Sequence, residues 1–108
     1  MFMITILVTG TSGMIGSSVA NKLLENGYRV IGVDRCDSKI DHENYTHIVI
    51  DLSEMPDVIS VFERCNIDRV IHLAAIAHAF SNGKITREDY YIANVVSARN
   101  VFIAASQK

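Results

Sequence analysis

The chain has 108 residues, of which 49% are hydrophobic and 20% charged, and its formal net charge is -2. A chain this short buries one modest core, so we expect one folded domain over residues 1–108. The balanced charge, without a lysine or arginine cluster, argues against nucleic acid as a partner. The apolar segment Met1 to Val8 is too short to cross a bilayer. Two widely spaced cysteines predict reduced thiols in a cytoplasmic protein and no metal site.

The first half of the chain predicts a strand, a glycine turn, a helix and a second strand. Ile4 to Val8 is a continuous apolar run, typical of a strand covered on both faces. Apolar residues at helical spacing predict a helix from Met14 to Asn26, which stops at Gly27 in the left-handed conformation. The second strand is expected from Tyr28 to Asp34, followed by a polar loop that reaches about Tyr45.

The second half predicts two more strands and two helices. His47 to Ile50 is the third strand, a helix opens near Ser53, and Arg69 to Leu73 is the fourth strand. Thr86 and Asp89 stand at the spacing of a capping box and open the last helix. The positions that carry this helix to the end of the chain are Ile92, Val95, Val96, Arg99, Phe102 and Ile103.

This alternation of strands and helices defines the expected fold class. With right-handed crossovers, the order β, α, β, β, α, β, α gives an α/β fold, a partial Rossmann-type doubly wound parallel sheet. The expected spatial order of its strands is 3-2-1-4.

The glycine turn after the first strand is the candidate ligand site. Gly10 permits a sharp turn off the strand, Gly13 lets the backbone approach a phosphate, and Gly16 lets the helix pack on the sheet. Amides in the first turn of a helix, with the positive end of its dipole, favour a pyrophosphate. The turn therefore predicts a dinucleotide cradle. The alternative is a glycine turn that joins a strand to a helix for steric reasons alone.

Asp34 strengthens the dinucleotide hypothesis. It ends the second strand, at the distance downstream where a carboxylate accepts hydrogen bonds from the adenosine ribose hydroxyls. A carboxylate there repels a 2′-phosphate, so the predicted cofactor is NAD rather than NADP. Arg35 complicates this preference, because an arginine beside the ribose could accommodate the extra phosphate. The alternative for Asp34 is a turn residue at a strand end.

Five motifs in this order resemble the extended short-chain dehydrogenase/reductase family, in particular its NAD-dependent epimerase/dehydratase group, which includes UDP-glucose 4-epimerase. The motifs are Thr9-Gly10-x-x-Gly13-x-x-Gly16, Val33-Asp34, Asp51-Leu52, His72-Leu73-Ala74-Ala75 and Asn94. The resemblance covers essentially the whole chain but only the N-terminal portion of such a protein. It implies an NAD-binding Rossmann domain whose later strands and substrate-binding part are absent.

The resemblance also implies roles for individual residues. Those implied to line the pyrophosphate are Gly10, Gly13, Met14 and Ile15, and those implied to flank the ribose are Asp34 and Arg35. The adenine would lie by Asp51 and Leu52, and the end of the fourth strand would pass the cofactor with Leu73, Ala74 and Ala75. Asn94 would reach back toward that strand.

Other roles stay open for several of these residues. Asp51 directly follows a strand, at the edge where ligands bind, but it could instead cap the helix that opens near Ser53. Asn94 could be only a structural tie between helix and loop. His72 is expected to be a packed core residue, and the role of His78 in the following loop is open.

The chain departs from the family in its catalytic residues. The resemblance implies a tyrosine with a lysine four positions later, yet none of the four tyrosines has one, so no catalytic residue is assigned. The leading hypothesis is therefore the NAD-binding part of a nucleotide-sugar epimerase or dehydratase, incomplete by itself. A stand-alone NAD(P)-binding or sensing module and a methyltransferase-like site are the alternatives. An unpaired fourth strand and the last helix predict a homo-oligomer.

Overall fold

β1 (Thr5–Thr9) is buried along its whole length and forms the centre of the sheet. The computed structural model describes residues 3–74 and 86–107. In that part of the chain, four parallel strands lie in the order β3-β2-β1-β4, as predicted. A central parallel strand meets side chains on both faces, which explains the unbroken apolar run of β1.

The remaining elements follow the expected alternation. The other strands are β2 (Arg29–Asp34), β3 (Tyr45–Val49) and β4 (Arg69–His72). The helices are α1 (Met14–Glu25), α2 (Met55–Arg64), α3 (Arg87–Tyr91) and α4 (Ser97–Ser106), and a π-helical segment, η1 (Ile92–Val96), joins the last two. The chain therefore has the partial Rossmann-type architecture expected from its sequence.

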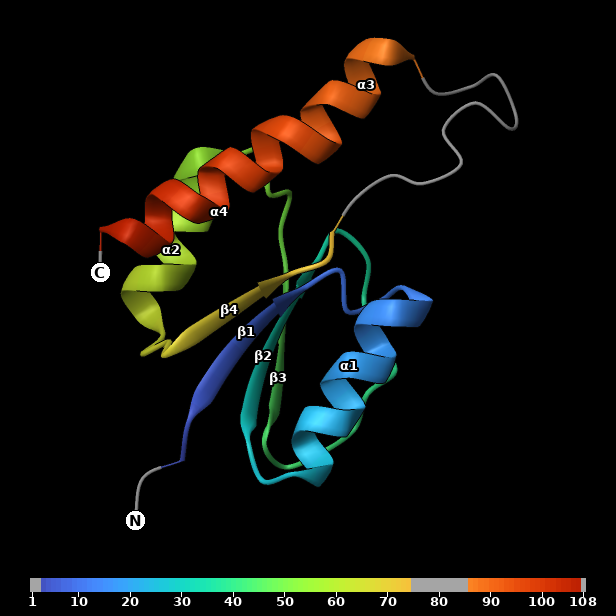
Figure 1. Cartoon of the computed structure of the whole chain (residues 1–108), viewed down its shortest axis with the longest axis vertical. Helices are drawn as coiled ribbons and strands as arrows, with labels where there is room; N and C mark the ends of the chain where they lie inside the picture. The colour runs from blue at the N-terminus through green and yellow to red at the C-terminus, as the bar shows by residue number, and fades with distance from the viewer. Residues whose placement is uncertain (1–2, 75–85, 108) are drawn as a thin grey trace.

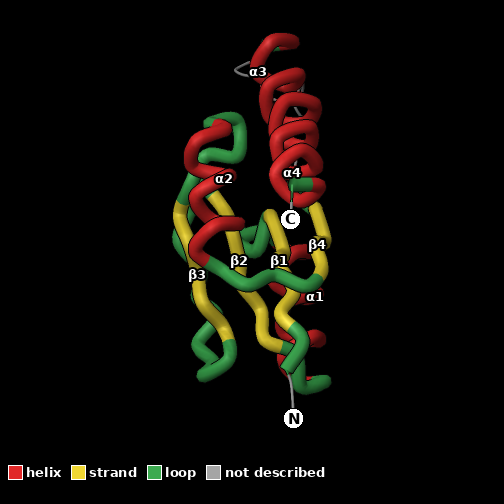
Figure 2. The backbone as a smooth tube through the Cα atoms, turned by 90° about the vertical axis from the view of Figure 1, so that its left-hand side faces the viewer, coloured by secondary structure: helices red, strands yellow, loops and turns green. Residues whose placement is uncertain are grey.

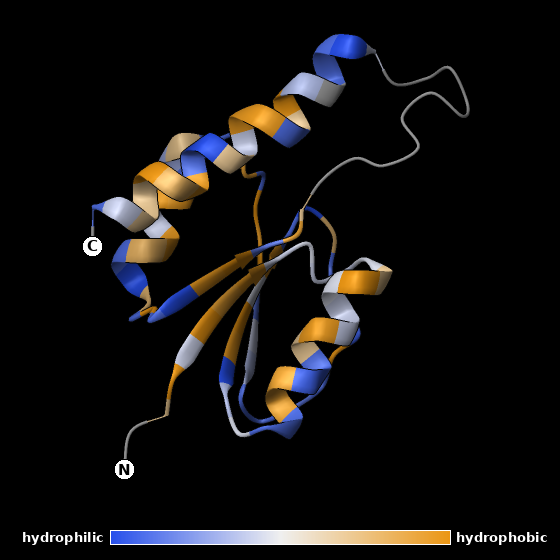
Figure 3. Cartoon of the chain, viewed as in Figure 1, coloured by the Kyte–Doolittle hydropathy of each residue, from blue (hydrophilic) through white to orange (hydrophobic). Residues whose placement is uncertain are grey.

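Helices cover both faces of the sheet and create two separate cores. α1 lies on one face, and α2 and α4 lie on the other (Figures 1 and 2). Ile6, Val8 and Val30 point toward α1, whereas Leu7 and Val33 point toward α2 and α4. Alternate residues of a strand face opposite sides, so β1 supplies both cores. In Figure 3 the middle parts of β1 and of its neighbour β4 are coloured as apolar.

Two predicted boundaries need correction. β3 begins at Tyr45, two residues before the predicted start, so Tyr45 belongs to the sheet and not to the loop. α2 begins at Met55, with Glu54 as its N-cap residue and a proline in its first turn. Parallel pairing with β2 extends β3 beyond its apolar residues, because the backbone of Tyr45 lies in register with Val30.

The buried face of the last helix also differs from the prediction. The capping box of Thr86 and Asp89 is confirmed, but Phe102 and Ile103 are 73% and 40% exposed. The face buried in α4 consists of Ser97, Asn100, Val101 and Ala104. The π-helical turn of η1 changes the residue spacing, and two polar residues in the buried face conceal it from a hydrophobicity pattern.

A core substitution tests this arrangement. Leu7 is 1% exposed, so Leu7→Ala leaves a cavity and should lower the free energy of unfolding by about 2–5 kcal/mol in urea denaturation. Phe102→Ala, on the exposed side of α4, should change it by less than about 0.5 kcal/mol at concentrations where the chain is monomeric. Equal losses for the two variants would contradict the burial described above.

Candidate functional site

The carboxyl ends of the strands bring most of the predicted site residues to one edge of the sheet. The glycine turn follows β1, Asp34 ends β2, Asp51 follows β3 and Leu73 follows β4. The amide of Gly10 donates a 2.8 Å hydrogen bond to the carbonyl of Val33, which ties the turn to β2. In open parallel sheets, ligands bind at this edge.

Two glycines of the turn are required by packing within the chain. Gly10 has φ +81°, and a Cβ there would lie 2.9 Å from the amide nitrogen of Ala74. A Cβ at Gly16 would overlap the carbonyl oxygen of Gly10. Both contacts are with backbone, which cannot move aside as a flexible side chain can. The turn, α1 and the end of β4 are therefore in van der Waals contact only because these residues are glycine.

Gly13 is different, because its own chain would tolerate a side chain there. The nearest atom to a Cβ at Gly13 is the Gly10 oxygen at 3.4 Å, an ordinary contact, and its φ of -83° suits any residue. Gly13 is the N-cap of α1, which has neither a side-chain cap nor an acidic residue in its first turn. Uncapped amides and open space beside Gly13 match the needs of a phosphate.

Met14 and Ile15 occupy the first turn of α1. Their side chains are 86% and 69% exposed, so their contribution to a phosphate site would come from their backbone amides.

Asp34 is held by two backbone amides. Its Oδ2 accepts a hydrogen bond from the amide of Ser12 at 3.1 Å, and its Oδ1 accepts one from the amide of Cys36 at 3.0 Å. The bond to Cys36 is one that a turn residue makes, whereas the bond to Ser12 joins β2 to the glycine turn. Each carboxylate oxygen has a further lone pair for another donor, so the group fits a ribose hydroxyl.

Arg35 and Asp51 lie close enough to influence each other. Asp51 Oδ1 accepts hydrogen bonds from the Ser53 amide at 2.9 Å and from the Ser53 hydroxyl at 2.8 Å. The amide bond is the main cause that holds the pKa of Asp51 below its usual value, with smaller help from the hydroxyl and from Arg35, and partial burial opposes it. The N-cap position of α2 is Glu54, which makes no side-chain cap hydrogen bond, so Asp51 caps the turn that precedes this helix rather than the helix itself.

Leu52 contributes to the core and to a link between layers. Its side chain is 6% exposed and packs with Val33 and Val58. Its carbonyl oxygen accepts a 2.9 Å hydrogen bond from the buried Asn100 side chain of α4. The segment after β3 is therefore anchored to α4.

The hydroxyl of Thr9 organises the end of β4. Thr9 Oγ1 accepts hydrogen bonds from the amides of Leu73 at 2.9 Å and Ala74 at 3.0 Å, and it lies 2.8 Å from Nδ1 of His72. The two amides occupy both lone pairs of the Thr9 oxygen, so its hydroxyl proton is donated to Nδ1 of His72. Nδ1 then acts as the acceptor, which means that the imidazole is neutral. Burial lowers the pKa of His72, in agreement with this. The side chain is half-buried.

Some predicted residues are outside the group described above. Ala75 and His78 lie outside the described residues, and Asn94 lies in η1, where it is half-buried. Sequence reasoning assigned no role to Thr9, Ser12 or Asn100. Thr9 and Ser12 stand inside the glycine motif, which was the one available signal, whereas the partners of Asn100 are distant in sequence.

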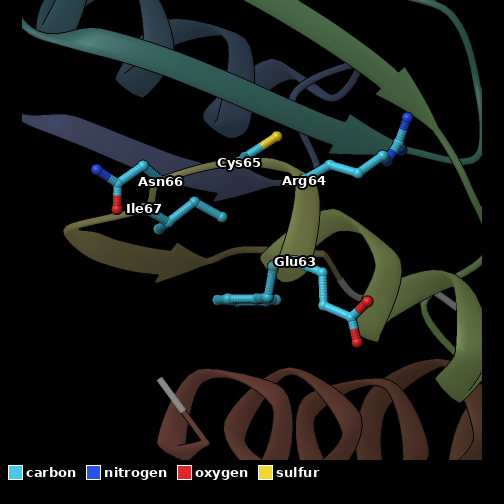
Figure 4. Close-up of a pocket in the computed structure, with 6 residues that line it drawn as sticks. Glu63, Arg64, Cys65, Asn66 and Ile67 are labelled. Carbon is cyan, nitrogen blue, oxygen red and sulfur yellow. The ribbon is translucent and has the colours of Figure 1, made fainter.

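The described surface has hollows at both ends of the strands. One, of about 520 Å³, lies between the glycine turn, the start of α1 and residues 37–41. The other, of about 220 Å³, lies between the end of α2 and the start of β4, at the opposite edge of the sheet. There the side chains of Glu63, Arg64 and Asn66 point in different directions (Figure 4). Ligand sites need convergent polar groups, which the second hollow lacks. The first hollow is the one that adjoins the candidate site.

The described part of the chain offers no other obvious site chemistry. Within residues 3–74 and 86–107, no cluster of three or more His, Cys, Asp or Glu side chains is placed to hold a metal ion. Among the helices described, none has the length and apolar character needed to span a bilayer.

Comparison with known proteins gives consistent matches. The sequence model of the NAD dependent epimerase/dehydratase family matches residues 6–108. A 3-beta-hydroxysteroid dehydrogenase from Mycolicibacterium neoaurum is 32% identical over 106 residues, which cover 94% of this chain and 28% of that protein.

Solved structures agree with the sequence matches. A Thermotoga maritima UDP-glucose 4-epimerase, solved with UDP-glucose, superposes with a TM-score of 0.85 and 28% identity, over 96% of this chain and 34% of the other. The Bordetella bronchiseptica enzyme WbmH in complex with NAD+ gives a TM-score of 0.81 and 28% identity, over 98% and 36%. The chain thus spans about a third of the length of these relatives.

Fold and site together define the dinucleotide-binding portion of a Rossmann-type protein. The chain belongs to the NAD dependent epimerase/dehydratase family and corresponds to its N-terminal, NAD-binding portion. The family resemblance and the strand order expected from the sequence are both confirmed.

The two kinds of glycine should respond differently to alanine. Gly16→Ala forces a methyl group onto the Gly10 backbone and should lower the free energy of unfolding by about 3 kcal/mol. Gly13→Ala meets only ordinary contacts and should change it by less than about 1 kcal/mol. Urea denaturation of both variants measures the difference. A large loss at Gly13 would show that its glycine serves packing rather than a ligand.

The environment of His72 predicts a pH dependence of stability. Because its pKa is lowered in the folded chain, the unfolded chain takes up the proton first as the pH falls below about 6.5. The contribution of the neutral His72 side chain to the free energy of unfolding is therefore complete above that pH and is lost as the pH falls below it. His72→Asn keeps an acceptor for Thr9 but does not titrate. Denaturation between pH 7.5 and 5.5 should show a steeper loss for the wild type, and parallel curves would contradict the neutral imidazole.

Proposed function

We propose that this chain binds NAD, with the pyrophosphate at the N-terminus of α1 and the adenosine ribose at Asp34. The observation that carries this proposal is the glycine at position 13. Packing within the chain does not require it, because a Cβ there would make only an ordinary contact. Residues assigned to the pyrophosphate are Gly10, Gly13, Met14 and Ile15. The first turn of α1 contains no acidic residue and has no side-chain cap, so its backbone amides can attract an anion.

The same proposal assigns the ribose to Asp34 and Arg35. Asp34 is oriented by the amides of Ser12 and Cys36, and its charge favours a free 2′-hydroxyl over a 2′-phosphate. Arg35 is exposed, and its positive charge helps to lower the pKa of Asp51. We therefore assign Arg35 to the rim of the site, with NAD as the preferred cofactor.

The remaining family positions are assigned around the adenine and along the cofactor. We place Asp51 and Leu52 beside the adenine, since both follow β3 at the ligand edge. Leu73, Ala74 and Ala75 would pass beside the cofactor, with Asn94 reaching toward them. Support for this comes from Leu73 and Ala74, whose amides are held by Thr9 next to the glycine turn.

The whole protein is proposed to act on a nucleotide sugar as an epimerase or dehydratase in the cytoplasm. Bound NAD supplies a hydride acceptor, and the residues described here hold and orient it. The catalytic Tyr-x-x-x-Lys pair of such enzymes is not among these 108 residues. A continuation of the reading frame that encodes this pair would support the enzyme. Its absence would favour a stand-alone NAD(P)-binding or sensing module.

Self-association belongs to the same proposal. Phe102 and Val95 are exposed on the last helical segment, and β4 is an edge strand in the described sheet. Exposed apolar surface of this kind favours association. A clean monomer in sedimentation at high concentration would argue against a homo-oligomer.

Calorimetric titration tests cofactor binding. The wild type should bind NAD and not S-adenosylmethionine, because an uncapped helix N-terminus next to a glycine turn accepts a diphosphate. Asp34→Asn should weaken NAD binding by about tenfold or more, the value of one hydrogen bond to a charged group. Gly13→Ala should weaken it similarly while leaving the fold intact.

A matched control is available on the far side of the sheet. Asp57 is exposed in the first turn of α2, which covers the opposite face of the sheet from α1, so Asp57→Asn makes the same chemical change at a residue that is not assigned to the cofactor. It should leave NAD affinity unchanged. Absence of NAD uptake by the wild type, or equal effects of the two asparagine variants, would overturn the proposal.

A further inference from the structure

Tyr45 and His47 of β3 form a hydrogen-bonded chain that reaches the glycine turn across β2. The Tyr45 hydroxyl lies 3.1 Å from Thr11 Oγ1 and 2.7 Å from Nδ1 of His47. The two rings stack with centroids 5.9 Å apart. Nε2 of His47 lies 2.8 Å from the carbonyl oxygen of Cys36 and donates to it, since a carbonyl only accepts.

Gly32 makes room for this chain. Gly32 lies in register with His47, between β3 and β1. A Cβ at Gly32 would overlap the Tyr45 hydroxyl and would lie 2.7 Å from Thr11 Oγ1. The missing side chain lets a tyrosine on an edge strand contact the turn after the central strand. Thr11, the last residue in this series of hydrogen bonds, is 0% exposed.

The contacts converge on the two segments that hold the Asp34 carboxylate. Asp34 receives its hydrogen bonds from the amides of Ser12 and Cys36. Ser12 follows Thr11, which Tyr45 contacts, and the Cys36 carbonyl is contacted by His47 at 2.8 Å and by the Ser12 hydroxyl at 2.9 Å. His47 thus acts on the peptide that follows the amide bonded to Asp34.

We propose that Tyr45 and His47 are positioning residues that fix the Asp34 carboxylate and thereby set the preference for NAD over its 2′-phosphorylated form. This inference rests on the proposed binding of NAD. Exclusion of a 2′-phosphate requires a carboxylate that cannot turn away. The loop after β2 is otherwise exposed and polar, and His47 supplies its bond from the sheet.

The variants are chosen to separate positioning from folding. His47→Leu removes the donor to Cys36, and His47→Gln can restore it from a side chain of similar reach. Tyr45→Phe removes the hydroxyl while keeping the ring in the α1 core. His42→Gln is the control, because His42 is exposed in the loop before β3 and the one described bond of its side chain is local, from the Asn44 amide.

The measured quantity is the ratio of the NADP and NAD dissociation constants on the full chain. A general loss of folding weakens both nucleotides alike and leaves this ratio unchanged. We expect His47→Leu and Tyr45→Phe to lower the ratio by about three- to tenfold, the effect of one hydrogen bond. His47→Gln and His42→Gln should keep it near the wild-type value.

Different outcomes separate the two proposals. If the wild type takes up NAD with a clear preference and neither His47→Leu nor Tyr45→Phe changes the ratio, the positioning role is overturned and NAD binding stands. If His47→Leu lowers the ratio and His47→Gln does not restore it, the bond to Cys36 does not cause the preference, and the positioning role of His47 is again overturned. If the wild type binds no NAD, the proposed function itself fails.

Discussion

The close packing of the glycine turn against its two neighbours is the constraint on which the rest of the site depends. α1 can begin against the Gly10 carbonyl only because residue 16 has no side chain, and the end of β4 can approach the turn only because residue 10 has none. These contacts bring a helix N-terminus to the carboxyl edge of the sheet. An anion site at that edge then needs no charged side chain, because amides and the helix dipole supply the attraction.

Short polar side chains extend this constraint to the neighbouring strands. Thr9 joins the end of β1 to the amides that follow β4, and Asp34 joins β2 to the turn through Ser12. Each bond satisfies a backbone amide at a strand end, where the ladder of the sheet stops. Groups that stabilise the edge thus also set the shape of the proposed NAD site, with Asn100 anchoring the segment after β3.

The sequence predicted the strand order and most of the candidate site, and it missed features that depend on distant partners. The glycine spacing and Asp34 identify a strand, a turn and an acidic strand end from neighbouring residues. In contrast, the predicted apolar positions of the last helix did not identify its buried face, because Asn100 is buried there through its bond to Leu52. The sequence around Tyr45 predicts a loop, because its strand pairing depends on Val30 in the neighbouring strand.

Local patterns by themselves therefore determined the alternation of strands and helices and the position of the glycine turn. These follow from periodicity, capping and glycine stereochemistry, which act within a few residues. Tertiary structure alone decided which polar groups meet. The Thr9 hydroxyl finds His72 63 positions away, and Tyr45 finds Thr11 at a separation of 34. Such hydrogen bonds form only after the parallel strands have aligned, so no local pattern encodes them.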